Sequence, residues 1–579
     1  MRRLGLAVLL FALAALPMKA LDRSAFSFTR YDLQVTIDPH QHGLAVEGTV
    51  ELRNISKGPQ REVSLQISSS LRWLSVQSGG APVEWLEQSY TSDIDHTGLL
   101  SEAIVKLDRP IAPGESLRLN LRYSGTVQRD TTRLERMGTP AGIARRSDWD
   151  EISEGFTALR GAGFVAWYPV SMEAANLSQG NELFEIMHGW REREASAVLR
   201  VQLSRAAAAE GDESKFIFVT NGSGDSAAPA ITGEFRGVDP VIVLLGDPAE
   251  TVDRPRVAAY YTAAHTNYAR DYMAAAENVI PLLEEWFGTP AQKVVLVELT
   301  DPDALPYDAG AYYFVPMREV PHGAAEVALA RPVVHAMLES PRPWIREGLT
   351  AFAQALIRER QSGRRAALSY LNQFSAALAV AEAQSHGLLP SGEGDSGQAT
   401  SIGLQPLVTT SDEVFFRTKA AYVWWMLRDM VGDRALQSAL AHYRPADDRD
   451  TAYMQRLMET QESPKRDLEA FFDDWVYRDR TLPQLKVDSA YVRQTLGEQT
   501  VTAVTIENLG ESWCEIPVAL RSANGEKMVR VVVPGKGKAT VRVALEGAPS
   551  EAEVNDGSVP EAEAREHLFP ITSTLSPEH

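Results

Sequence analysis

Two short stretches near the middle of the chain decide how its central region, residues 251–482, is interpreted. Arg331-Pro-Val-Val-His335 is followed, after the short connection Ser340-Pro-Arg-Pro343, by Trp344-Ile-Arg-Glu-Gly-Leu349. His335 and Glu347 are separated by this tight connection, and two helices joined by it can still place the two side chains face to face. An imidazole and a carboxylate that converge in this way are candidate metal ligands.

A hydrolytic zinc site of this kind requires the pattern H-E-x-x-H on one helix, with two imidazoles one turn apart and a glutamate as general base. Here Arg331 stands where the first histidine is needed and Pro332 where the base is needed. Two protein ligands hold zinc weakly, since catalytic sites use three ligands and a water. We therefore expect no resident metal. The alternative is zinc held by a reduced or rebuilt site at His335 and Glu347. A rebuilt site would draw on three further side chains, Glu339, His322 and Glu326.

The substitutions themselves suggest a structural consequence. Arg331 lies one helical turn before His335, and one hypothesis is that its guanidinium pairs with Glu347 and supplies the positive charge that a metal would bring. The alternative is an arginine that faces solvent. A buried carboxylate without such a partner would be costly. Proline is tolerated in the first turn of a helix but costs about 3 kcal/mol in its interior. We therefore expect the helix that carries His335 to begin at about Arg331 or Pro332.

The amino terminus has the pattern of an export signal, with Arg2 and Arg3 before an apolar run from Leu4 to Leu16 and a small residue, Ala20, at the expected cleavage point. Residues 1–20 are therefore predicted to be a signal peptide, and the protein to be exported to a periplasm or the exterior. An uncleaved anchor is the alternative. No later segment is long and apolar enough to span a membrane.

The formal net charge of the chain is −20. Nucleic acids and anionic membrane surfaces attract positively charged proteins, so this charge argues against either as a partner.

Periodicity divides the rest of the chain into three predicted domains. Residues 21–250 contain several alternating segments typical of half-buried strands and predict a β-sandwich. The apolar residues that alternate with polar ones are Tyr31, Leu33, Val35 and Ile37, then Leu117, Leu119, Leu121 and Tyr123, and then Ala197, Leu199, Val201 and Leu203. Residues 251–482 are predicted to be mostly helical, and residues 483–579 to form a second, smaller β-sandwich. The predicted helices cover 257–287, 344–361, 365–384, 416–431, 433–443, 451–461 and 464–477, and a strand is predicted at 293–299. The segment 385–412 has no periodicity and is predicted to be a long loop.

The carboxy-terminal domain contains two alternating runs, Val529–Val533 and Val541–Leu545, separated by Pro534-Gly-Lys-Gly-Lys538. This arrangement predicts a hairpin. The single cysteine, Cys514, lies in a predicted strand and is expected to be a buried, unreactive thiol.

The motifs resemble, in order, those of the gluzincin zinc aminopeptidases, in particular the membrane alanyl aminopeptidase group. Five stretches carry the resemblance: Tyr31-Asp-Leu-Gln-Val-Thr-Ile-Asp-Pro39, Trp344-Ile-Arg-Glu-Gly-Leu349, Lys419-Ala-Ala-Tyr-Val-Trp-Trp-Met-Leu427, Phe471-Phe-Asp-Asp-Trp-Val-Tyr477 and Leu482-Pro-Gln-Leu-Lys-Val487. The resemblance implies a multidomain α+β protein, with an amino-terminal β-sandwich, a thermolysin-like and mostly helical central domain, and a carboxy-terminal immunoglobulin-like β-domain. It also implies that His335 and Glu347 correspond to zinc ligands.

Two further positions depart from the family pattern. The family's G-x-M-E-N motif would fall at Gly310-Ala-Tyr-Tyr-Phe314, where Tyr313 replaces the glutamate that binds a substrate's free amine. Phe416 or Phe415 stands where a tyrosine would stabilise the tetrahedral intermediate. With the first histidine and the base, four catalytic positions have changed together. We therefore expect an aminopeptidase-like protein without peptidase activity that binds a peptide or protein. The alternative is a divergent metallopeptidase.

Overall fold

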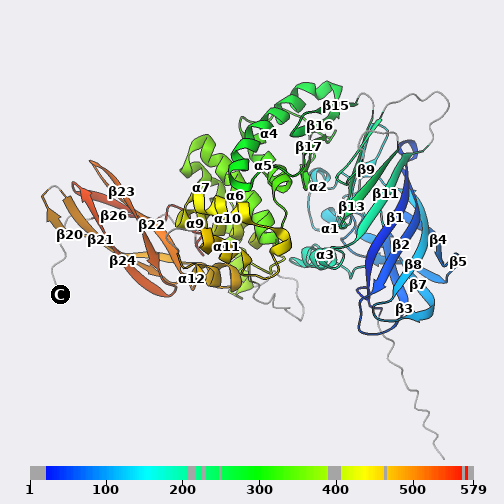
Figure 1. Ribbon diagram of the computed structural model, residues 1–579, viewed down its shortest axis with the longest axis horizontal. Helices are drawn as coiled ribbons and strands as arrows, with labels where there is room; N and C mark the ends of the chain where they lie inside the picture. Colours follow the sequence, from blue (N-terminus) through cyan, green and yellow to red (C-terminus); the bar gives the residue numbers. More distant parts are fainter. Residues whose placement is uncertain are drawn as a thin grey trace, which may run out of the picture.

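The computed structural model shows an elongated molecule in which strands form both ends and helices fill the middle (Figure 1). It describes residues 21–206, 216–224, 230–246, 249–388, 406–461, 466–497, 499–563 and 567–571. Strand-rich, helix-rich and strand-rich segments follow one another along the chain. Among the described residues, none of the helices has the length and apolar character needed to cross a membrane. Residues 1–20 and most of the predicted loop 385–412 lie outside the described residues.

The amino-terminal region is built on a seven-stranded sheet of order β13-β11-β1-β2-β8-β4-β5, and a three-stranded sheet of order β3-β7-β6 accompanies it. The alternating residues predicted to face inward are buried, as in β1, where Tyr31, Leu33, Val35 and Ile37 are each at most 2% exposed. The strands are β1 (Phe26–Asp38), β2 (Gly43–Asn54), β3 (Gln60–Ser68), β4 (Leu71–Ser78), β5 (Ala81–Pro82), β6 (Trp85–Thr91), β7 (Leu99–Ile111), β8 (Ser116–Thr126), β11 (Val198–Arg205) and β13 (Ala230–Arg236). Three short helices connect them, α1 (Thr132–Arg136), α2 (Ala141–Ser147) and α3 (Glu182–Arg193).

Two further sheets join this region to the helices. A four-stranded sheet, β12-β14-β10-β9, shares one hydrophobic cluster with a five-stranded sheet, β15-β16-β17-β19-β18. Trp149, Phe156 and Val243 come from the side of the first sheet, and Tyr260, Val297 and Phe314 from the second. The strands are β9 (Glu151–Ile152), β10 (Phe156–Arg160), β12 (Phe216–Thr220), β14 (Val241–Gly246), β15 (Ala249–Asp253), β16 (Val257–Thr262), β17 (Val294–Glu298), β18 (Tyr307–Ala309) and β19 (Tyr312–Val315).

The prediction of one helix over 257–287 was wrong in its first part. Residues Val257–Thr262 form strand β16, which pairs in parallel with β17, and helix α4 begins only at Thr266. A strand that is buried on both faces shows no alternation of apolar and polar residues, so a short apolar run is easily mistaken for part of a helix. The strand predicted at 293–299 is present as β17.

The central helices agree with the predictions, with two corrections. The segment predicted as one helix over 365–384 is two helices, interrupted at Gln373 and Phe374. In the segment predicted over 464–477, residues 466–468 are not helical and the helix begins at Glu469. Periodicity alone does not reveal a break inside a helical pattern or the residue at which a helix begins. The helices are α4 (Thr266–Phe287), α5 (Ala324–Met337), α6 (Pro343–Ser362), α7 (Arg364–Asn372), α8 (Ser375–Ser385), α9 (Ala420–Val431), α10 (Asp433–His442), α11 (Tyr453–Gln461) and α12 (Glu469–Phe472). Two π-helical turns, η3 (Val414–Lys419) and η5 (Asp473–Tyr477), adjoin α9 and α12.

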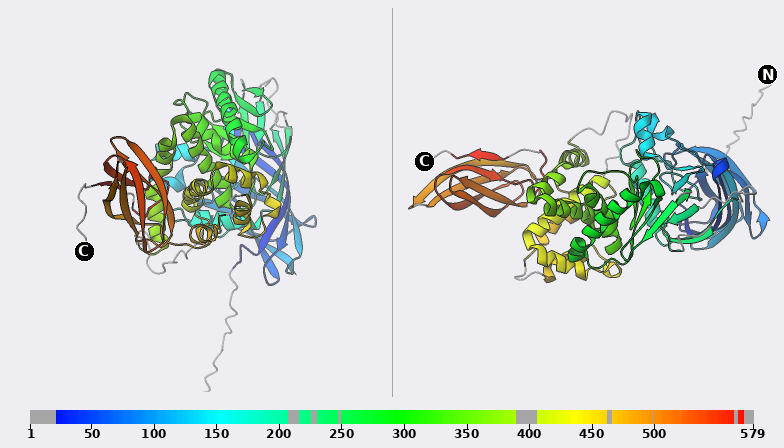
Figure 2. Two further views of the ribbon diagram at one scale, coloured as in Figure 1. Left: turned by 60° about the vertical axis from the view of Figure 1, so that its left-hand side comes forward. Right: turned by 90° about the horizontal axis from the view of Figure 1, so that it is seen from above.

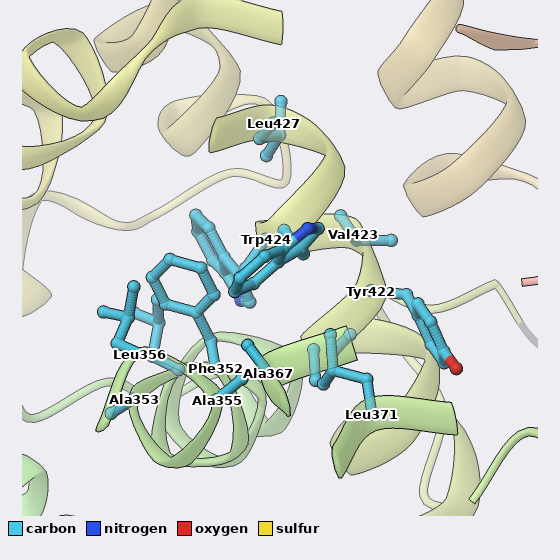
Figure 3. Close-up of a cluster of buried hydrophobic side chains, with 14 of the residues drawn as sticks. Phe352, Ala353, Ala355, Leu356, Ala367, Leu371, Tyr422, Val423, Trp424 and Leu427 are labelled. Carbon is cyan, nitrogen blue, oxygen red and sulfur yellow. The ribbon is translucent and has the colours of Figure 1, made fainter. Parts of the chain in front are cut away.

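Helix α6 lies at the centre of the helical core and packs against α5, α7 and α9. Figure 3 shows Phe352 and Leu356 of α6 beside Trp424 of α9 and the apolar side chains of α7. The rings of Trp344 and Trp424 stack with their centroids 5.0 Å apart. Gly348 makes this close approach feasible, since a Cβ atom there would lie 2.5 Å from the Cβ of Ala420. This packing holds the first two turns of α6 rigidly in place.

The carboxy-terminal region consists of a three-stranded sheet, β20-β21-β24, and a four-stranded sheet, β23-β22-β25-β26 (Figure 2). The strands are β20 (Leu485–Leu496), β21 (Gln499–Asn508), β22 (Cys514–Ser522), β23 (Gly525–Val533), β24 (Gly537–Glu546), β25 (Pro549–Val554) and β26 (Leu568–Pro570). Cys514 is buried, as predicted.

The predicted hairpin over Val529–Leu545 is wrong. Strand β23 pairs with β22 and strand β24 with β21, so the turn between them crosses from one sheet to the other. Lys536 in this turn has a positive φ of 50°, and its N–H donates to the carbonyl of Gly510. Alternation identifies the buried face of a strand but not the strand with which it pairs.

Candidate functional site where helices α5 and α6 face each other

Helix α5, which carries Arg331 and His335, starts earlier than the sequence predicts. It begins at Ala324, after Gly323 in the left-handed conformation, and Pro332 lies inside it. Interior proline costs about 3 kcal/mol because it removes a hydrogen bond and crowds the preceding turn. The turns before Pro332 bury Val327 and Leu329, and this burial offsets the cost.

Helix α6 places Glu347 opposite α5. Pro343 occupies its first turn, where proline is well tolerated, and the stacked Trp344 anchors that turn in the core. Glu347 is only 7% exposed. A carboxylate at this depth requires cationic partners, because an isolated buried charge is strongly unfavourable.

Arg331 is the innermost of those partners. Its Nη2 donates to Glu347 Oε2 over 3.0 Å, and its Nε donates to Asp308 Oδ1 over 2.9 Å. A longer contact of 3.4 Å joins Nη1 to the hydroxyl of Thr350. Of the two alternatives for Arg331, the structure therefore shows the pairing with Glu347 and not a side chain that faces solvent. Asp308, in strand β18, was not predicted, since no motif marks it.

His335 lies between the same two carboxylates. Its Nε2 is 3.5 Å from Glu347 Oε1, and its Nδ1 is 3.5 Å from Asp308 Oδ2. These separations are within the range of an ion pair, but neither ring nitrogen makes a well-formed hydrogen bond within the described structure. His335 is 8% exposed, so it is a buried member of the charge network.

Two further arginines complete the network on its outer side. Arg346 Nε donates to Glu347 Oε1 over 3.1 Å, and Arg417 Nε lies 3.5 Å from Glu347 Oε2. Arg417 comes from the π-helical turn η3 and also pairs with Glu413. Sequence reasoning missed both arginines. Arg346 stands next to Glu347 in the motif, and Arg417 lies in the stretch where Phe416 was singled out.

The electrostatics of this network favour ionised carboxylates. Burial opposes ionisation of Glu347, but the contacts with His335, Arg331 and Arg346 outweigh it and hold the pKa of Glu347 well below its usual range. Burial likewise opposes the charge on Arg331, and Asp308 and Glu347 more than compensate, so the pKa of Arg331 is raised. Arg331 therefore remains a cation and Glu347 an anion throughout the ordinary pH range.

The other predicted site residues do not join the network. Tyr313 is a core residue of β19 at 6% exposure, and burial raises the pKa of its hydroxyl. Phe416 packs, half buried, against the helical core. His322 and Glu339 are exposed, and Glu326 accepts a hydrogen bond from Gln361.

A zinc ion, which the resemblance to aminopeptidases implies, does not fit these side chains. Three guanidinium groups lie within 3.5 Å of the one carboxylate that would be a ligand, and a divalent cation would have to approach all three. Only His335 and Glu347 stand where ligands are required, which is one fewer than a catalytic zinc needs.

A second buried cluster lies on the other side of η3. Glu382, His386 and Asp479 place one candidate ligand atom each within 4.8 Å of one another, the one such group of three in the described part of the chain. Lys419 occupies this cluster as well, with its Nζ 2.6 Å from Glu382 Oε1 and 3.7 Å from Asp479 Oδ1. The lysine thus supplies the positive charge that a metal would otherwise bring.

Comparison with known proteins gives structural matches alone. The sequence matches no family model and no curated protein. Among solved structures, the chain is similar to the M1 zinc metallopeptidase from Deinococcus radiodurans, with 19% sequence identity, 76% of this chain and 90% of that chain covered, and a TM-score of 0.44. A mutant of that enzyme bound to a Tyr-Ser-Ala substrate gives 19% identity, coverage of 79% and 96%, and a TM-score of 0.45.

Proposed function

We propose that this chain is an exported, aminopeptidase-like protein that binds a peptide or protein without hydrolysing it. The single observation that carries the proposal is the hydrogen bond from Arg331 to Glu347. The guanidinium of Arg331 supplies the positive charge that a metal would supply to Glu347, the residue that resembles the family's distal zinc ligand. It offers no site at which a water molecule becomes a nucleophile.

The side chains that remain at the site can bind a ligand but lack the groups needed to hydrolyse it. Peptide hydrolysis by this class of site needs a positioned base, and the position that would hold one is Pro332. Tyr313 is buried in the core and presents no carboxylate to a substrate amine. The half-exposed guanidinium groups of Arg346 and Arg417 are the polar groups of the network that a ligand can reach.

The proposal is tested by the zinc content and the activity of the same preparation. Protein purified without added metal is analysed for bound zinc and assayed with aminoacyl nitroanilides and short peptides, with and without a chelator. We expect well under one zinc per chain and no hydrolysis that the chelator abolishes. About one zinc per chain together with chelator-sensitive hydrolysis would instead support the alternative, a divergent metallopeptidase using His335 and Glu347.

A further inference from the structure

On its outer side, the network around Glu347 has guanidinium groups whose hydrogen-bond donors are not all taken up by the network's own carboxylates. Arg331 is largely enclosed, whereas the side chains of Arg346 and Arg417 are 50% and 38% exposed. Both exposed arginines approach the same carboxylate, one at each oxygen. Their charged ends are therefore held together at the surface, on the side of Glu347 that faces solvent.

Each of these two arginines retains hydrogen-bond donors. A guanidinium carries five N–H donors on three nitrogens. Arg346 uses its Nε on Glu347, and Arg417 directs its Nε toward Glu347 and its Nη1 toward Glu413. Within the described ranges, both terminal nitrogens of Arg346 and the Nη2 of Arg417 make no hydrogen bond to protein. Converging, solvent-facing guanidinium groups with free donors are a binding site for an anion.

The balance of charge leads to the same conclusion. Arg331, Arg346 and Arg417 contact two carboxylates, the buried Glu347 and the partly buried Asp308, so these five side chains together have an excess of one positive charge. Glu413 neutralises that excess from the surface, where its side chain is 40% exposed. A half-exposed glutamate that is held by one arginine is a group that an external carboxylate can replace.

We propose that Arg346 and Arg417 bind a carboxylate of the peptide ligand, either its carboxyl terminus or an acidic side chain, with Glu413 as an intramolecular competitor. This inference rests on the proposed function, since it names the chemistry of the peptide that the site takes. Carboxylates match the planar fork of arginine, which donates two parallel hydrogen bonds. The site should not bind a free amino terminus, because the positive charge of its ammonium group would be repelled by two guanidinium groups.

The test compares three short peptides that carry a fluorophore at the amino end. One has a free carboxyl terminus, one is amidated and neutral, and one is amidated but contains a glutamate. Binding to the full-length protein is measured by fluorescence anisotropy at low and high salt. We expect both carboxylate-bearing peptides to bind at least about tenfold more tightly than the neutral amide at low salt, and the difference to shrink at high salt.

Variants separate the site from general electrostatics. Arg346→Gln and Arg417→Gln should each weaken binding of the carboxylate peptides by about tenfold, and Glu413→Gln should strengthen it. Arg360→Gln is the matched control, since this exposed arginine lies about 21 Å further along the same helix and changes the net charge equally. Circular dichroism of each variant checks that the fold is retained.

The outcomes distinguish this inference from the function on which it rests. Equal affinity for the neutral amide and the carboxylate peptides would overturn the carboxylate site but leave peptide binding intact. Equal effects of Arg346→Gln and Arg360→Gln would also overturn it. Binding of none of the three peptides would overturn both the proposed peptide binding and the carboxylate site.

Discussion

The Nη2 of Arg331 on helix α5 donates to the Oε2 of Glu347 on helix α6 over 3.0 Å, in a part of the core where both side chains are largely excluded from water. Taking two such charges out of water is costly, and their mutual attraction compensates for that cost only while both partners are present. The pair is therefore weak evidence for added stability. It is strong evidence that neither residue can be removed alone without a penalty.

Replacing Arg331 alone should destabilise the protein markedly. Arg331→Ala leaves the buried Glu347 and the partly buried Asp308 with fewer cations, and we expect a loss of about 3–5 kcal/mol of unfolding free energy. Urea unfolding followed by tryptophan fluorescence measures it, because Trp344 and Trp424 lie in the adjoining core. Arg346→Ala, whose side chain is half exposed, should cost at most about 1 kcal/mol. Equal effects of the two substitutions would contradict the burial argument.

Replacing Arg331 by histidine should introduce metal binding. In Arg331→His a second imidazole stands one turn before His335 and faces Glu347, which brings the number of candidate ligands to three. We expect the variant to retain zinc after dialysis and to be stabilised by added zinc in a thermal melt. Arg331→Gln removes the same charge without adding a ligand and should retain none. A zinc-free Arg331→His would mean that α5 and α6 hold these positions too far apart for coordination.

A methyl group at position 348 should disturb the packing beside the site. Helix propensity alone favours alanine over glycine by about 1 kcal/mol. The added Cβ of Gly348→Ala would lie 2.5 Å from Ala420 Cβ and 3.1 Å from Trp424 Nε1, and overpacking of this kind costs about 1–3 kcal/mol. We therefore expect a lower melting temperature.

The matched control for that substitution is Gly189→Ala, in helix α3. Nothing lies within 4 Å of a Cβ atom added there, so this change should raise the melting temperature through propensity alone. If Gly348→Ala stabilised the protein as much as Gly189→Ala does, the close approach of α6 and α9 would be disproved.

The cluster around Lys419 should make stability depend on pH. The close contact with Glu382 raises the pKa of His386 against the effect of partial burial, and Asp479 adds to the rise. Because the folded pKa lies above the unfolded value of about 6.5, the stabilisation is complete below about pH 6.5 and is lost as the pH rises through the folded pKa. Melting temperatures between pH 5.5 and 8.5 should therefore fall more steeply for the wild-type protein than for His386→Gln. Identical slopes would show that His386 contributes nothing to this dependence.

The candidate site was only partly predictable. The sequence places Arg331 and His335 four residues apart, so they share a helix face, and the shortened connection to Glu347 still allows contact across two helices. Asp308 and Arg417 were not predictable in this way. They approach from strand β18 and from a π-helical turn, 23 residues before Arg331 and 70 residues after Glu347, and no spacing rule links such segments.

The sequence by itself determined which residues face inward along β1, β8 and β11, the order of strand-rich and helix-rich regions, and the absence of a histidine and a base from the H-E-x-x-H position. Only the tertiary structure decided that Val257–Thr262 is a strand, that Pro332 lies within α5, that β23 and β24 belong to different sheets, and that three arginines meet at Glu347. The reason is physical. Periodicity is a local property that identifies the buried face of an element, whereas its partner is set by the packing of segments that are distant along the chain.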